Sequence, residues 1–266
     1  MSESIENAPL LELIAELRWA THAQAVAPHT PKIIQSTSDV EQLFMKFGAI
    51  VHQLGYSEPT RIVPPQFPML EGQPVLRFNM NQEGETKSLF QIGPGLFSAN
   101  AVPPYRHWSD FAPVVKSGVE ALLKARPPAD ASQPITAINL RYLDAFGPLH
   151  MQEKDPTAFI VDTLGIKVSL PEALTQHLQE GKPWNSFLQF QIPVEDGVTM
   201  GFAIGQGIAN DKPAMLMDTS VSATGAFAPN SDEIMARFNR AHLLISKSFK
   251  DLMQPIAHLM PMKKGE

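Results

Sequence analysis

The segment from Ser88 to Phe111 limits the fold most strongly, because it joins an apolar stretch, a forced bend and an aromatic approach to a helix. Residues 89–92 are typical of a strand, and a Gly-Pro-Gly sequence follows them at 93–95. Glycine reaches positive φ and proline fixes its own φ, so this sequence predicts a defined bend. A strand, a bend, an extended continuation to Asn100 and a helix are therefore expected in this order.

Two aromatic side chains stand between this extended stretch and the predicted helix. Pro103 and Pro104 stiffen the backbone, while Tyr105 and Trp108 offer a broad contact area with a polar edge. Two interpretations stay open at this point. The aromatic pair forms a corner packed beneath the helix, as is usual for aromatic residues, or it belongs to a binding surface.

The rest of the chain alternates between strand-like and helix-like patterns. From residue 9 to residue 19, leucine and alanine alternate with Glu12, Glu16 and Arg18, which is typical of a half-buried strand. Apolar residues at helical spacing predict helices over 38–54, 109–126, 155–164 and 171–180 and from residue 230 or 231, the second of them capped by Ser109. The other predicted strands cover residues 75–80, 135–146, 187–194, 198–208 and 214–223.

This order of elements predicts an α+β fold made of two pseudo-repeated halves. Each half reads as a strand, helical material, two or three strands and a helix, with the boundary near residues 127–134. Leu-Arg-Trp at 17–19 in the first half parallels Leu-Arg-Tyr at 140–142 in the second. We expect residues 1–130 and 131–266 to form one compact unit, with an antiparallel sheet covered by helices on one face.

The uncovered face of that sheet is the best candidate for a functional surface. Alternation in the second-half strands places small and polar side chains together on it, with Arg141 as a further member: Gln189, Gln191, Thr199, Gly201, Ala203, Gly205, Gly207, Asp218, Ser220 and Ser222. A simple solvated face explains this pattern, but small residues also allow a ligand or another backbone to approach. If Arg141 is buried, Asp218, Glu12 or Glu16 is its expected partner; otherwise it is free for an anionic ligand or an acidic partner residue.

Composition excludes several kinds of chemistry. There is no cysteine, so thiolate catalysis, disulfides and cysteine metal sites are absent. The 8 histidines form no HxH, HxxxH or HExxH pair, and GFAIGQG lacks the Lys-Ser/Thr and the helix that a phosphate loop needs. A net charge of −6 without a central basic cluster disfavours nucleic acid. No apolar run spans a bilayer and no secretion signal begins the chain, so a cytoplasmic protein is expected.

Three motifs, NAPLLELIAELRW, QIGPGLFSANAVPPYRHWSDF and INLRYLDAF, occur in this order along the chain. With them the chain resembles an uncharacterised, sporadically distributed bacterial protein family. The residues matching the family's second motif are Gln91, Gly93, Phe97, Asn100, Tyr105 and Trp108. The family's LRY motif is followed by Asn, whereas this chain has Asp144, offset by one position. The patchy distribution resembles that of mobile defence genes, so the resemblance implies an accessory or anti-phage role but no specific activity.

These observations lead us to predict a non-enzymatic recognition protein that binds a partner protein or a phage component. The partner is expected to be encoded by a neighbouring gene, and a homodimer is a further expectation; neither cofactor nor metal is expected. A sensor of a small anionic ligand or lipid, with a pocket between the halves that contains Arg141, is the alternative, followed by a hydrolase without a recognisable motif. The predicted binding residues are Asn100, Tyr105, Trp108, Arg141, Tyr142 and Asp218.

Overall fold

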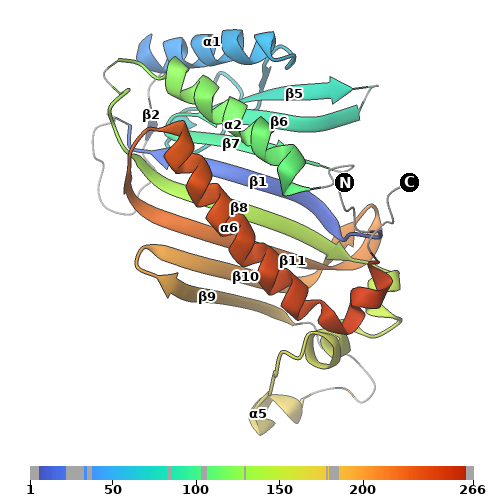
Figure 1. Ribbon diagram of the computed structural model, residues 1–266. Coiled ribbons are helices and arrows are strands. Elements are labelled where there is room, and N and C mark those ends of the chain that lie inside the picture. The colour runs from blue at the N-terminus through green and yellow to red at the C-terminus, as the bar shows by residue number, and fades with distance from the viewer. Residues whose placement is uncertain are drawn as a thin grey trace.

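Three long helices lie on one side of a large antiparallel sheet in the computed structural model (Figure 1). The structure describes residues 6–21, 33–34, 38–82, 85–102, 107–128, 130–177, 179 and 186–261. Among these residues the sheet has 9 strands in the order β3-β5-β6-β7-β1-β8-β11-β10-β9, and a separate 2-stranded sheet joins β2 to β4. The fold class is therefore mixed α+β, with the helices α1, α2 and α6 on one face.

The first part of the chain supplies one edge and the middle of the large sheet. Its elements are β1 (Leu10–Trp19), β2 (Ile33–Ile34), α1 (Ser38–Gln53), β3 (Thr60–Arg61), β4 (Met69–Leu70), β5 (Leu76–Gln82), β6 (Glu85–Gly93), β7 (Leu96–Ala101) and α2 (Trp108–Ala125). The predicted bend is confirmed as the tight connection between β6 and β7, where Gly95 has φ 73°. Positive φ of this size is a conformation that glycine adopts without a steric penalty.

The second part supplies the other edge and the longest helix. Its elements are β8 (Ile135–Phe146), α3 (Pro148–Met151), α4 (Pro156–Ala158), the π-helical turn η1 (Phe159–Thr163), α5 (Glu172–Thr175), β9 (Phe187–Glu195), β10 (Val198–Ala209), β11 (Lys212–Phe227), α6 (Ser231–Leu252) and the 3₁₀ turn η2 (Gln254–Leu259). The strands β1 and β8 pair with each other and join the two parts in one continuous sheet.

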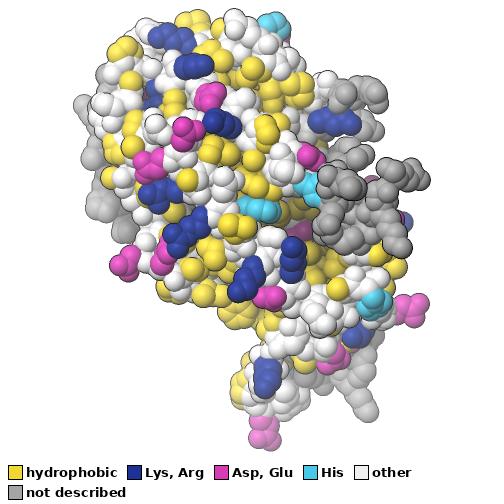
Figure 2. Space-filling model, in the orientation of Figure 1, with side chains coloured by type: hydrophobic (Ala, Val, Ile, Leu, Met, Phe, Trp, Pro, Cys, Tyr) yellow, Lys and Arg dark blue, Asp and Glu magenta, His cyan; other side chains and the backbone are white. Residues whose placement is uncertain are grey.

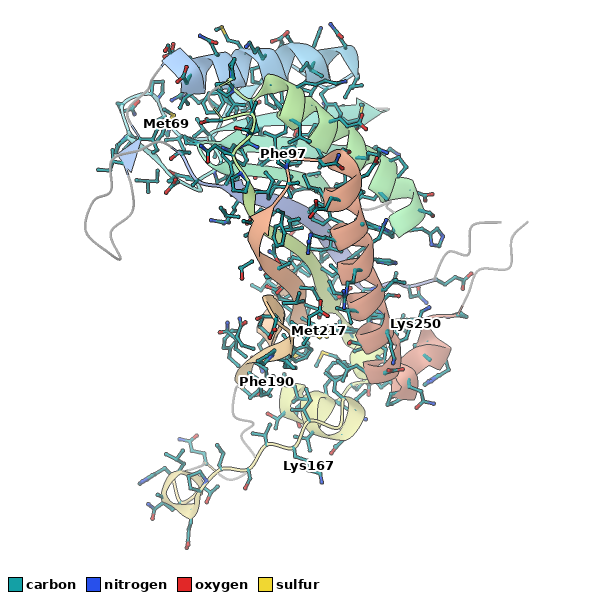
Figure 3. The ribbon with its side chains drawn as sticks, turned by 60° about the vertical axis from the view of Figure 1, so that its left-hand side comes forward. Met69, Phe97, Lys167, Phe190, Met217 and Lys250 are labelled. Atoms are coloured by element: carbon teal, nitrogen blue, oxygen red, sulfur yellow. The ribbon has the colours of Figure 1, made fainter. Side chains whose placement is uncertain are left out.

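The main core lies between the sheet and the helices. Leu13, Ala15 and Leu17 of β1 are fully buried, as their alternation predicted. Phe97 of β7 points toward α2 (Figure 3), and a Cβ atom added at Gly118 of α2 would lie 2.7 Å from the ring of Phe97. The absence of a side chain at Gly118 therefore allows α2 to approach the sheet closely.

The helix α6 crosses β8 and β11 and carries its buried residues on one stripe (Figure 1). Its N-terminus is capped by Asn230, whose Oδ1 accepts hydrogen bonds from the backbone N–H groups of Asp232 and Glu233 at 2.9 and 3.1 Å. Within the described part of the chain, no helix is long and apolar enough to cross a membrane.

Some sequence predictions for helix boundaries were wrong. Ser109 is not a cap, because α2 already begins at Trp108 and the extended residue before it is His107. The predicted helix over 171–180 is only Glu172–Thr175 among the residues described there. Its side chains are exposed, so no packing extends the helix further. The predicted loop over 22–31 lies outside the described residues.

Candidate functional site

The helix-free face of the sheet carries a row of mostly polar or small residues across its centre. The register aligns Asn100 of β7, Ile14 of β1, Arg141 of β8, Ser220 of β11, Gly201 of β10 and Gln191 of β9. Their strand neighbours, such as Leu13, Leu140 and Val221, are buried on the helix side, so the row points away from the helices. The sequence prediction that the small and polar residues of β9, β10 and β11 share a face with Arg141 is confirmed.

An ion pair between Arg141 and Asp218 lies at the centre of this face. The Nε atom of Arg141 donates to both carboxylate oxygens of Asp218 at 2.8 Å, and Nη2 donates to Oδ2. The side chains remain 42% and 28% exposed, so the pair is accessible from outside. The hydrogen bond to Asp218 is the main reason why the pKa of Arg141 is raised, and the charges of Glu12 and Glu16 add to it.

Asn100 is also on this face but it is buried, with 5% of its surface exposed. Its Nδ2 donates to Oε1 of Glu12 at 2.7 Å, and its Oδ1 accepts from Ser98 at 2.9 Å. These bonds connect β7 to β1 and satisfy the amide, which is what a buried polar side chain requires. Asn100 therefore helps to orient Glu12 beside Arg141.

Beyond Asp218 the face becomes a shelf of small residues on β10. Gly201 and Ala203 lie opposite Ser220 and Asp218, and Gln191 and Gln189 of β9 lie on their other side. A Cβ atom at Gly201 would lie 2.6 Å from the hydroxyl oxygen of Ser220. The hydroxyl group of Ser220 therefore covers the buried Gly201, and the surface of the shelf is formed by small side chains such as Ser220 and Ala203.

Trp108 and Tyr142 lie on the opposite side of the sheet, beneath the helices. Trp108 donates from Nε1 to Oδ1 of Asn239 at 2.7 Å, and its ring stacks on His242 with centroids 5.3 Å apart. The hydroxyl of Tyr142 is hydrogen-bonded to Nδ1 of His242 at 2.7 Å. Burial, and secondarily the charge of Lys250, lowers the pKa of His242, so the imidazole is neutral at pH 7.

The structure therefore divides the predicted binding residues between two places. Asn100, Arg141 and Asp218 share the helix-free face, Trp108 and Tyr142 share the helix side, and Tyr105 lies outside the described residues. His242 and Asn239 of α6 were not predicted as members of either group. Their spacing of three residues on one helix was the available signal, since it puts them on one face.

A surface groove of about 500 Å³ also runs between α2 and α6, and its lining includes Lys116, Asp232 and Asn239. Arg141 is on the other side of the sheet, so this groove is separate from the ion pair. In the part of the chain that the structure describes, no three histidine or carboxylate side chains are arranged to hold a metal ion.

Comparison with known proteins gives no relative for this chain: no protein-family model, no curated protein and no solved structure matches it.

Proposed function

We propose that this protein is a non-enzymatic recognition protein whose helix-free sheet face binds a partner protein. The observation that carries this proposal is the half-exposed Arg141–Asp218 pair at the centre of that face. Arginine presented in a fixed orientation is a frequent anchor at protein interfaces. Ala203 lies opposite Asp218 and adds only a methyl group to the face, which leaves room for a partner side chain beside the pair.

The charges on this face favour a protein over a phosphate-rich partner. Arg141 is paired with Asp218, and Arg18 donates to Glu16 at 2.7 Å. Paired arginines leave no concentrated positive footprint, which nucleic-acid binding requires. The same pairing disfavours the alternative of a free anion sensor, because an anion must compete with Asp218 for the guanidinium group.

The strand order supports the proposed duplication. The sets β5-β6-β7-β1 and β8-β11-β10-β9 meet at the β1–β8 pair. In each set the strand that comes first in the sequence lies at this central pair, and the other three follow in sequence order from the outside of the set toward it. Under this proposal residues 1–130 and 131–266 are two copies of one α+β unit. The helix-free face then spans both copies and has the extent of a protein interface rather than of a small-ligand pocket.

The identity of the partner follows from the resemblance to the sporadic bacterial family. We propose a cytoplasmic accessory or anti-phage protein whose partner is the product of a neighbouring gene or a phage component. A second copy of the chain is the other outcome, and size-exclusion chromatography with light scattering distinguishes it, because a homodimer forms without any added partner.

The test is capture of the partner from the native host, with and without phage, by the wild type and by Ser220→Arg. Ser220 lies between Arg141 and Gly201 on the face, so a long side chain there blocks approach while Arg141 and Asp218 themselves are kept. The matched control is Gln53→Arg, which adds the same side chain at an exposed position at the end of α1. Loss of the partner in Ser220→Arg alone supports the proposal. Equal capture by both variants, or no specific partner with the wild type, refutes it.

A further inference from the structure

The helix side of the sheet contains a second feature, a hollow beside α6. Figure 2 shows it next to two histidine side chains, with an acidic side chain at its base. In the same orientation, the ribbon places β1 and β8 behind this region, where α2 and α6 diverge (Figure 1). The hollow therefore lies over the β1–β8 pair, where the two parts of the sheet meet.

Asp144 is the acidic residue that these strands direct toward the helices. Both strands are described in full, and Glu12 and Glu16 of β1 point to the helix-free face. Asp144 alternates with Tyr142 and Phe146 on the helix side of β8 and lies opposite Met217 of β11. Only 3% of its surface is exposed. A carboxylate thus lies among apolar and aromatic neighbours.

Among the residues that the structure describes, no hydrogen bond or ion pair engages the carboxylate of Asp144, and none contributes to its pKa. This is unusual, because buried carboxylates are normally paired or hydrogen-bonded. Burial is the main reason why the pKa of Asp144 is raised to about 7, and the charge of Asp218 adds to the shift. The raised pKa reflects an environment that lacks a positive charge.

The side chains around the helix side of β8 do not provide that positive charge. His242 is hydrogen-bonded to Tyr142 and stacked on Trp108, and burial keeps its imidazole neutral. Lys250 of α6 acts electrostatically on His242, and no ion pair joins it to Asp144. At the N-cap of α2, the Nε2 atom of His107 is also buried without a hydrogen-bond partner. Two polar groups of this region are therefore unsatisfied.

We propose that the hollow is a binding site for a small organic amine, whose ammonium group pairs with the carboxylate of Asp144. Tyr142 lies two residues before Asp144 on the same face of β8, and the edge of its aromatic ring can accommodate the apolar part of such a ligand. An ammonium donor supplies the hydrogen bonds and the charge that the described residues do not give this carboxylate. The site uses neither Arg141 nor the shelf on β10, so its lining is separate from the proposed partner surface.

The test is isothermal titration calorimetry at pH 8 with benzylamine and butylamine, each compared with its uncharged analogue, benzyl alcohol or 1-butanol. The expected result is saturable binding of at least one amine, at least tenfold weaker binding of its alcohol, and at least tenfold weaker amine binding by Asp144→Asn. Asp211→Asn is the matched control, because it removes the same charge from an exposed turn. Its amine affinity should equal that of the wild type.

Three results would overturn the proposal: no saturable binding of either amine, equal binding of amine and alcohol, or unchanged amine binding by Asp144→Asn. Asp144→Leu provides a second variant that removes both the charge and the hydrogen-bonding groups, in case the asparagine amide still binds weakly. Amine binding by Asp144→Leu at wild-type affinity likewise contradicts the site. Partner capture by the Asp144 variants should stay at the wild-type level, which separates this proposal from the recognition function.

Discussion

Replacing Asp144 by asparagine should stabilise the protein, and the gain should grow as the pH rises. Burial raises the pKa of Asp144 from 3.8 to about 7 in the folded protein. Between these two values the folded chain holds a proton that the unfolded chain has lost, so stability falls as the pH increases through this window. A difference of about 3 pH units corresponds to about 4 kcal/mol of lost stability above pH 7. About 3 kcal/mol of this loss falls between pH 5 and pH 9.

Asparagine has nearly the same shape as aspartate but does not ionise, so the variant should not undergo this loss. Its amide is still buried without a partner, which costs about 1–3 kcal/mol at every pH. The net effect of Asp144→Asn should therefore be small at pH 5 and stabilising by about 1–3 kcal/mol at pH 9. Urea unfolding of wild type and variant at unit steps from pH 5 to pH 9 measures the difference. Asp211→Asn, at an exposed turn, should show no such trend.

A difference in stability that does not change with pH would refute this reasoning. It would mean that Asp144 does not titrate in the window, either because water reaches the carboxylate or because a hydrogen-bond donor pairs with it in solution. A saturating amine should stabilise the wild type at high pH, because it binds ionised Asp144 only in the folded state. The added stability should vanish in Asp144→Asn.

Four further substitutions test the packing that positions both surfaces. In chemical denaturation, Gly118→Ala should destabilise the protein by about 1–3 kcal/mol, because the new Cβ lies 2.7 Å from two phenylalanine rings. Gly48→Ala is its control and should be near neutral, because the nearest ring atom is 3.3 Å away. Tyr56→Phe removes a buried 3.0 Å hydrogen bond and should cost about 1 kcal/mol at pH 7. Burial raises the pKa of Tyr56 to about 12, so the wild type should lose stability from pH 10 to 12 and the variant should lose less. Trp108→Phe removes the 2.7 Å bond to α6 and should lower stability by about 1 kcal/mol in thermal unfolding.

Period-two alternation allowed much of the sheet to be predicted. It predicted β8 with the bounds that the structure shows, and it put Arg141 on one face with Asp218, which was named in advance as a candidate partner. The same rule also implies that Arg141 and Tyr142, which are adjacent in a strand, point to opposite faces. Treating them as one binding group ignored this consequence. Their separation was therefore available from the sequence.

Other features depend on how helices cross the sheet, which local patterns do not determine. His242 reaches Tyr142 and Trp108 only because α6 crosses β8 beside the start of α2. The three-residue spacing of Asn239 and His242 puts both on one face of α6, but it does not indicate which strand that face meets. The short strands β3 and β4 lie in a proline-rich connection, where two-residue pairings produce no periodic signal. These are long-range contacts, and they follow from the assembled fold.

The partner surface and the hollow share the strand β8, which carries Arg141 on one face and Asp144 on the other. The charge of Asp218 links the two surfaces. Asp218 is on the helix-free face, yet its charge contributes to the raised pKa of Asp144 on the other face. Replacing Asp218 by asparagine should therefore lower the pKa of Asp144 and strengthen amine binding. The measurement is a carbon-13 NMR titration of the Asp144 carboxyl group in wild type and Asp218→Asn. An unchanged pKa would show that the sheet screens the two faces from each other.

If the pKa does fall, partner binding and amine binding are coupled. A partner that draws Arg141 away from Asp218 leaves the aspartate charge unneutralised, and this charge further disfavours ionised Asp144. The partner should then weaken amine binding, and by thermodynamic reciprocity the amine should weaken partner binding by the same factor. The helix-free face would in that case report on the occupancy of the hollow, and neither surface alone would describe what the protein recognises.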